Sequence, residues 1–161
     1  MIDGLERDAL RAWVGDLAAT PRLWAPHVRH RPDERIFVEL ETPPGAEAWL
    51  ICWMPGHDTG FHDHDLSNGA VAIVEGELVE ERLAIGGPPR RQRYGAGTSF
   101  HFDASHVHRM HQADSGPTIS IHAYSPPLWR MGAYTIEPDG ALRRSSISYA
   151  EELRPADTEA A

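Results

Sequence analysis

The spacing of hydrophobic residues changes from a helical to a strand-like pattern near residue 35. In residues 5–19 (LERDALRAWVGDLAA) the apolar side chains fall at the i, i+3, i+4, i+7 spacing of one helical face: Leu10, Trp13, Val14 and Leu17. This spacing predicts an amphipathic helix that ends before Pro21, followed by a short helix or loop. We therefore expect a helical segment over about residues 1–32.

From Arg35 onward, short segments rich in β-type residues are separated by Gly and Pro. These segments read RIFVELE, AWLICWMP, GAVAIVEGELVEERLA, RQRYGAGTSFHF, HVHRMHQA, TISIHAYS, MGAYTIEP and ALRRSSIS. About eight strands at such spacing are typical of a double-sheet jelly roll, whose interior can hold one small site. We expect a single all-β domain with a jelly-roll β-barrel at about 33–149 and an acidic tail at about 150–161.

Composition excludes several classes of function. The net charge of −9 repels nucleic acid and anionic lipid, although all 15 basic residues are Arg, which suits carboxylate recognition. No apolar run approaches the length of a membrane span, and the start MIDGLERDAL does not resemble a signal peptide. We expect a soluble, cytoplasmic protein without nucleic-acid or membrane partners, as a monomer or weak homo-oligomer.

Cysteine and histidine usage indicates how a metal site would be built. Cys52 is the single cysteine of the sequence, so a metal site would have to consist of His and carboxylates. Cys52 itself lies in the apolar segment WLICW and is expected to be a small buried hydrophobe. Histidine is concentrated instead, with eight of the ten His between residues 57 and 122.

Two histidines in GFHDHD have the spacing of metal ligands on one strand. His62 and His64 are two residues apart, so on an extended strand both imidazoles leave the same face. Such pairs are also common on protein surfaces, and a metal would need a third ligand from another strand. The segment HVHRMHQ supplies candidates, of which we choose His108, with His106 and His111 as alternatives.

Glycines around these histidines resemble the first signature of the cupin superfamily. Gly56, five intervening residues, His62, one residue and His64 are followed by Gly69 and Gly76. Gly69 stands where many cupins have a glutamate ligand. The resemblance implies a cupin-type jelly roll whose ligand set lacks the carboxylate.

The second cupin signature is matched more loosely. Gly97 and His108 have the expected separation, but Asp103, Ser105 and Gln112 replace the usual Pro, Gly and Asn. Three neutral imidazoles would leave the charge of a divalent metal uncompensated and several coordination positions open. Such a site favours an anionic chelating substrate, for which a thiolate is the natural candidate.

Three blocks between about residues 35 and 134 are similar to the cysteine dioxygenase family of thiol dioxygenases. LICWMPGHDTGFHDHD contains the family's Cys-Trp, Gly-rich turn and HDH, and HVHRM resembles its third-ligand block. SIHAYSPPL carries the family's Ser-x-His-x-Tyr triad followed by Ser-Pro-Pro. Ser120, His122 and Tyr124 alternate with apolar residues and therefore share one face of a strand. The resemblance implies catalytic residues that hold the Tyr124 hydroxyl near the metal.

The same resemblance implies residues that bind the substrate. Arg35 lies close to where the family keeps the arginine that binds the substrate carboxylate, and Arg130 competes for this role by analogy with related enzymes that act on 3-mercaptopropionate. Trp129 and Met131 are expected to shape the pocket wall. Gly69 takes the place of the cysteine that animal enzymes cross-link to the active-site tyrosine, so no thioether can form.

Together these residues predict a non-heme Fe(II) thiol dioxygenase with O2 as co-substrate. We expect L-cysteine as the substrate and cysteine sulfinic acid as the product, with 3-mercaptopropionate or another mercapto-acid as the alternative. No organic cofactor is expected. Two further classes stay open: another metal-dependent cupin enzyme, such as an isomerase, and a ligand-binding cupin with a vestigial His cluster.

Overall fold

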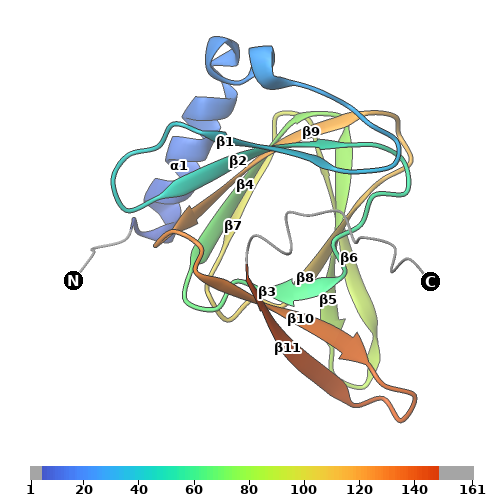
Figure 1. Cartoon of the computed structure of the whole chain (residues 1–161). Helices are drawn as coiled ribbons and strands as arrows, with labels where there is room; N and C mark the ends of the chain where they lie inside the picture. Colours follow the sequence, from blue (N-terminus) through green and yellow to red (C-terminus); the bar gives the residue numbers. More distant parts are fainter. Residues whose placement is uncertain (1–4, 149–161) are drawn as a thin grey trace.

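The computed structural model describes residues 5–148, which form two antiparallel sheets that face each other (Figure 1). The five-stranded sheet contains, in spatial order, β1 (Ile36–Leu40), β2 (Glu47–Trp53), β9 (Thr118–Ser125), β4 (Asn68–Glu75) and β7 (Ser99–Phe102). The six-stranded sheet contains β11 (Leu142–Ser148), β10 (Arg130–Ile136), β3 (Phe61–Asp63), β8 (His108–Gln112), β5 (Glu77–Ala84) and β6 (Gly87–Gly95). The prediction of an all-β jelly roll is confirmed. The acidic tail expected at 150–161 lies outside the described residues.

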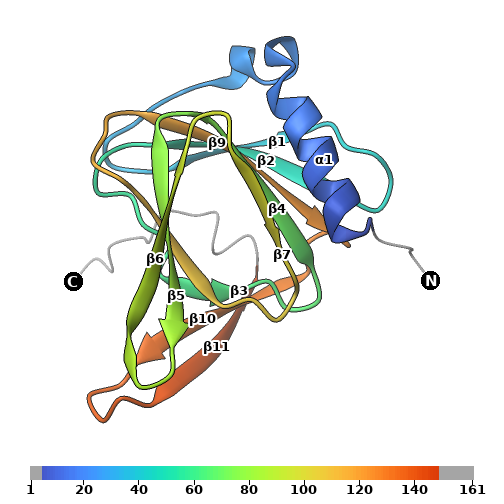
Figure 2. The same cartoon turned by 180° about the vertical axis from the view of Figure 1, so that it is seen from behind.

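The N-terminal helix covers the outer face of the five-stranded sheet (Figure 2). Helix α1 (Arg7–Ala18) buries Leu10, Val14 and Leu17, as the apolar spacing predicts. Two short 3-10 helices follow, η1 (Pro21–Leu23) and η2 (Ala25–His27). The apolar stripe of α1 thus supplies one hydrophobic core, on the side of the sheet away from the barrel interior.

Two predicted segments each contain a tight turn and form two strands. Gly76, with φ of 74°, separates β4 from β5, and a Cβ at this residue would lie 2.2 Å from Thr118 Oγ1. Gly97, with φ of 82°, lies between β6 and β7. With the short strand β3 added, the described residues form eleven strands where the sequence pattern showed eight segments.

Strand β9 lies in the middle of the five-stranded sheet and is buried along its whole length. Ile121 and Ala123 pack in the core that includes α1. Alternation along the strand therefore turns Ser120, His122 and Tyr124 toward the six-stranded sheet, and Tyr124 belongs to the second core between the two sheets. The polar stripe in SIHAY consequently faces the barrel interior.

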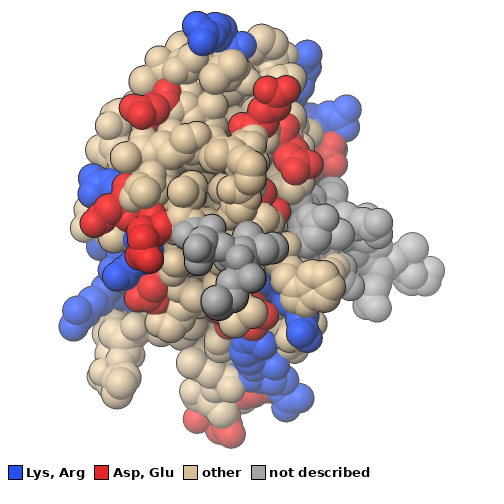
Figure 3. Space-filling model, turned by 90° about the vertical axis from the view of Figure 1, so that its left-hand side faces the viewer, with Lys and Arg blue, Asp and Glu red and all other residues tan. Residues whose placement is uncertain are grey.

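Acidic and basic side chains are mixed on the face shown in Figure 3, where they lie around an area of uncharged atoms. Within residues 5–148 no helix has the length and apolar character that a bilayer span requires. The described helices are instead amphipathic or very short.

Candidate metal centre and active site

Strands β3 and β8 bring three histidines together inside the barrel. His62 and His108 are direct partners across the two strands, and His64 follows β3 on the same side as His62. The ring centroids lie 4.7 Å apart for His62 and His108 and 4.8 Å apart for His62 and His64. All three side chains are buried, and one nitrogen from each falls in a cluster within 4.8 Å. The three histidines chosen from the sequence therefore lie together in space and could hold a metal ion.

Hydrogen bonds orient two of the three rings. His62 Nδ1 lies 3.0 Å from the Gly60 carbonyl oxygen, and His108 Nδ1 lies 2.8 Å from Glu80 Oε1. Since a carbonyl and a carboxylate accept hydrogen bonds, both Nδ1 atoms carry the proton and both Nε2 lone pairs remain for a metal. His64 differs, because neither of its ring nitrogens has a hydrogen-bond partner within the described chain.

The electrostatics of the three histidines favour the neutral, ligating form. Burial lowers the pKa of His62 and His64 well below the usual value, and the neighbouring imidazoles of His108 and His62 respectively lower it further, because two rings so close together resist carrying charge at the same time. Burial also lowers the pKa of His108, although Glu80 opposes this change. A buried nitrogen without a partner costs about 1–3 kcal/mol, which a metal bond to His64 would remove. The donor set thus fits a divalent metal such as Fe(II).

A buried carboxylate that the sequence analysis missed lies behind this cluster. Glu80 has no exposed surface and accepts hydrogen bonds from His106, His108 and Arg82. Burial by itself would raise the pKa of Glu80, but these hydrogen bonds together hold it well below its usual range. A signal was available in the segment ELVEERLA, because Glu80 shares a strand face with Leu78, which is fully buried.

The other two candidates for the third ligand take different positions. His111 lies three residues after His108 and therefore points to the opposite face of β8, where Nε2 is 3.3 Å from Glu81. His106 precedes the strand and directs Nε2 to Glu80 at 2.8 Å. Of the three histidines, His108 is the one that the structure places beside His62 and His64.

Ser120 and His122 are joined in a chain of buried hydrogen bonds. Trp53 Nε1 donates to Ser120 Oγ at 2.8 Å, and Ser120 Oγ lies 2.9 Å from His122 Nε2. The Ser120 hydroxyl can accept from Trp53 and donate to His122, which leaves the imidazole proton on Nδ1. Burial, with smaller contributions from His108 and Arg35, lowers the pKa of His122 to about 3, so the ring is neutral near pH 7. Sequence analysis did not assign Trp53 a role.

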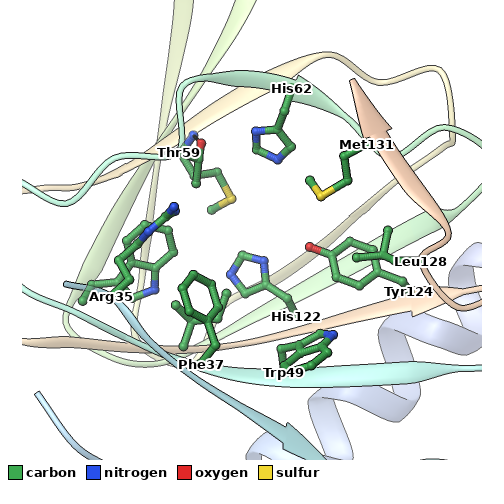
Figure 4. A pocket seen from close by; sticks show the side chains of 12 residues that line it. Arg35, Phe37, Trp49, Thr59, His62, His122, Tyr124, Leu128 and Met131 are labelled. Atoms are coloured by element: carbon green, nitrogen blue, oxygen red, sulfur yellow. Dashed lines mark hydrogen bonds between the residues drawn. The ribbon is translucent and has the colours of Figure 1, made fainter. Parts of the chain in front are cut away.

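One pocket reaches the histidine cluster at His62, whereas His64 and His108 do not line it, and Figure 4 shows its interior. The rings of His62 and His122 and the Tyr124 hydroxyl point toward one common space, and Arg35 lies on the side opposite Tyr124. The guanidinium of Arg35 lies over two aromatic rings, 5.2 Å from the Phe37 centroid and 5.3 Å from that of Trp53. The remaining lining residues are Trp49, Ile51, Thr59, Met110, Leu128 and Met131.

The structure places two of the four predicted substrate-binding residues in the pocket and two outside it. Arg35 and Met131 line the pocket. Trp129 is 71% exposed and Arg130 is also exposed, and the pocket lining contains neither of them. Because neighbouring residues on a strand point to opposite sides, the burial of Met131 turns Arg130 outward. Trp129 precedes the strand and does not form the wall that we expected.

Phe102 occupies the space next to Gly69. A Cβ atom at residue 69 would lie 2.1 Å from Phe102 Cζ. The Phe102 ring packs between histidines, with centroid distances of 4.8 Å to His64, 4.7 Å to His108 and 5.2 Å to His106. A phenyl ring thus fills the volume in which a side chain at residue 69 would approach His64 and His108, another contact that the sequence analysis missed.

Comparison with solved structures identifies the fold. An uncharacterized conserved protein with a double-stranded β-helix domain from Klebsiella pneumoniae superposes with a TM-score of 0.54 and 15% identity, over 75% of this chain and 92% of that chain. A cupin superfamily protein from Desulfitobacterium hafniense superposes with a TM-score of 0.54 and 12% identity, over 64% of this chain and 87% of that chain. The fold is therefore that of the cupins.

Sequence comparison identifies the family. Cysteine dioxygenase type 1 of Danio rerio is 30% identical over 89 residues, which are 49% of this chain and 44% of that protein. The Homo sapiens protein of the same name is 27% identical over 90 residues, with the same two coverages. The chain matches less than half the length of these curated relatives. The family model described as cysteine dioxygenase type I, however, matches residues 8–137, and these include the three histidines and the SIHAY segment. The chain belongs to the cysteine dioxygenase type I family.

Proposed function

We propose that this protein is a thiol dioxygenase that binds one Fe(II) ion through His62, His64 and His108. The overall reaction is RSH + O2 → RSO2⁻ + H⁺, in which the sulfur loses four electrons and dioxygen gains them. The observation that carries the proposal is one pocket in which His62, Tyr124 and Arg35 face a common space (Figure 4). Bound iron would supply the electronic route between dioxygen and the thiolate.

Arg35 is the group that we propose for binding the substrate carboxylate. A guanidinium can grip both carboxylate oxygens and fix their plane. The rings of Phe37 and Trp53 both pack against the guanidinium, which limits the rotamers available to it. Apolar side chains such as Leu128 and Met131 form much of the remaining wall and exclude water from the bound thiol. We propose that a small mercapto-acid binds between Arg35 and His62.

Tyr124 is the group that we propose for hydrogen bonding to the reacting centre. Its hydroxyl points into the pocket beside His62, where it can donate to an oxygen of the forming sulfinate (Figure 4). The chain from Trp53 through Ser120 fixes the His122 ring next to this space. Tyr124 and His122 would therefore orient the reacting groups and hold a proton in position, while the three histidines would hold the metal.

Two thiols are the leading substrate candidates. L-Cysteine, which would give cysteine sulfinic acid, is the first, because its carboxylate and thiolate suit Arg35 and the metal. 3-Mercaptopropionate is the second, and the composition of the wall favours it: among the described residues that line the pocket there is no Asp or Glu to bind an ammonium group. The amine of cysteine would need the metal as its partner instead.

Oxygen uptake by the iron-loaded protein across a thiol panel tests the proposal. The panel contains L-cysteine, 3-mercaptopropionate and cysteamine, which has a thiol and an amine but no carboxylate. We expect stoichiometric oxygen consumption and sulfinate formation with one or both mercapto-acids, and weak activity with cysteamine. Iron binding without oxygen uptake for any thiol would refute it, and activity with Zn or Mn on a sulfur-free substrate would favour another cupin enzyme. Failure to bind iron would favour a ligand-binding cupin.

A further inference from the structure

The proposed ligand set has no negative charge of its own, yet a carboxylate lies one imidazole away from it. Glu80 on β5 is completely buried, and its Oε1 is 2.8 Å from His108 Nδ1. Strand β5 pairs with β8 in the register that sets Glu80 opposite Met110 and Arg82 opposite His108. The pairing of these two strands therefore delivers the carboxylate to the back of a candidate ligand.

Four side chains of the described residues form hydrogen bonds with the Glu80 carboxylate, and all four can donate. Oε1 receives His106 Nε2 and His108 Nδ1, each at 2.8 Å. Oε2 receives Arg82 at 2.8 Å and the Tyr94 hydroxyl at 3.3 Å. Burying a carboxylate is costly unless such donors surround it. Because four donors surround the Glu80 carboxylate and none of its surface is exposed, it is held in place as a hydrogen-bond acceptor.

This arrangement has two consequences for His108. An acceptor at Nδ1 keeps the proton on that atom and leaves the Nε2 lone pair on the side of His62 and His64. It also places a negative charge behind one neutral ligand, which makes that ligand a stronger donor to a cation. Neither consequence requires Glu80 to touch the metal.

We propose that Glu80 is a positioning residue of the metal centre, which orients His108 and supplies the negative charge that the three-histidine ligand set lacks. The inference rests on the proposed metal site but not on the identity of the thiol. Glu80, His106 and His108 also lie close enough together to hold a metal themselves, with donor atoms within 4.8 Å. The two hydrogen bonds at 2.8 Å favour an acceptor role instead, and the experiment below separates the two arrangements.

Glu81 provides a matched control on the same strand. It is 3% exposed, but it points to the other face of β5 and pairs with Arg91 at 2.8 Å and His111 at 3.3 Å. E81Q therefore removes one buried, ion-paired carboxylate without touching His108. A difference in metal affinity between E80Q and E81Q therefore depends on where the carboxylate lies. It does not reflect the general cost of removing a buried carboxylate from β5.

The experiment measures Co(II) and Fe(II) affinity by chelator competition, together with imidazole ¹⁵N NMR of the metal-free protein. We expect E80Q to weaken metal binding by about 10- to 100-fold and to change the Co(II) absorption spectrum, while E81Q does neither. The ¹⁵N spectrum should place the His108 proton on Nδ1 in the wild-type protein and show a mixed tautomer in E80Q. E80D, with the charge on a side chain one methylene shorter, should recover part of the affinity.

Wild-type affinity and an unchanged tautomer in E80Q would overturn the proposal. If E80Q does not fold, as judged by circular dichroism, E80D replaces it, and wild-type affinity in E80D would overturn the proposal as well. Loss of metal binding in H106A would show that the metal sits among Glu80, His106 and His108, which also contradicts it. Metal binding without thiol oxidation would refute the proposed function alone, whereas a wild-type protein that binds no metal would refute both.

Discussion

His62 lies directly opposite His108 across strands β3 and β8, with the two ring centroids 4.7 Å apart. The two residues lie 46 positions apart in the sequence, and the pairing of β3 with β8 places their imidazoles side by side. His64 adds the third ring from the end of β3. A metal bound here would link two neighbouring strands, so its binding should stabilise the barrel.

Removal of His64 should abolish metal binding. Its two ring nitrogens are buried without a partner in residues 5–148, and in the loaded protein the metal would be the partner of one of them. We expect H64A to lose stoichiometric iron and H106A to retain it, as measured by metal analysis after gel filtration. Full iron occupancy in H64A would contradict the three-histidine site. The increase in melting temperature on adding Fe(II) should disappear in H64A as well.

Replacement of Arg35 should weaken the binding of carboxylate-bearing thiols. A hydrogen bond to a charged group contributes about 1.5–3 kcal/mol, so R35A should raise KM for the mercapto-acid by about 10- to 100-fold. R130A is the matched control, because Arg130 is exposed on β10 and does not line the pocket. Steady-state oxygen uptake measures both variants. An unchanged KM in R35A, or a raised KM in R130A, would show that the carboxylate binds elsewhere.

Loss of the Tyr124 hydroxyl should lower turnover but keep the metal. The hydroxyl points into the pocket, and positioned proton donors contribute about 10²- to 10⁴-fold to rate. We therefore expect Y124F to lower kcat by about 10²-fold with unchanged iron content. Y134F is the control, because the Tyr134 hydroxyl donates to Asp63 at 2.7 Å outside the pocket lining. Equal turnover in Y124F and the wild-type enzyme would rule out this role.

Acid should destabilise the fold through Asp63, the residue between His62 and His64. Burial alone would raise its pKa, but hydrogen bonds from Arg144, Tyr134 and the Asp65 amide lower it from 3.8 to about 2. Because the folded-state pKa is the lower one, the unfolded chain binds the proton first. The stabilisation, about 2 kcal/mol, is present above the unfolded-state pKa and is lost as the pH falls from about 3.8 to about 2.

Substitution of Arg144 tests this linkage. Arg144 donates to both Asp63 oxygens, at 2.7 and 2.9 Å. R144A should lower the free energy of unfolding at neutral pH by about 2 kcal/mol and flatten its dependence on pH in that acid window. R143A should change it by less than about 1 kcal/mol, because Arg143 forms an exposed pair with Glu137. Urea unfolding at several pH values measures both. An equally steep acid dependence in R144A would contradict the assignment.

A methyl group at residue 69 should be destabilising. Its Cβ would overlap the Phe102 ring, which three histidines hold in place. We expect G69A to lower the free energy of unfolding by about 1–3 kcal/mol through overpacking. G15A, in the interior of α1 where a Cβ meets no atom within 4 Å, should raise it by about 0.5–1 kcal/mol. Chemical denaturation measures both, and equal stability of the wild-type and G69A proteins would show that Phe102 can move aside.

Local patterns in the sequence determined which face each short segment would bury. The apolar spacing predicted the buried side of α1, His-x-His placed His62 and His64 on one side, and the alternation in SIHAY placed Ser120, His122 and Tyr124 together. These predictions depend on the period of a helix or strand, which a few consecutive residues define. Family resemblance added the assignment to the cysteine dioxygenases, which the family match confirmed.

Only the tertiary structure decided which of these faces meet. The sequence favoured His108 but kept His106 and His111 as alternatives, and it is the register of β3 against β8 that brings His108 beside His62. The same holds for Glu80, which became a neighbour of His108 through the pairing of β5 with β8, and for Arg35, which lines the pocket while Arg130 does not. The physical reason is that the two-residue period of a strand determines to which side each side chain points. The pairing of distant strands depends instead on burial and hydrogen bonding throughout the barrel.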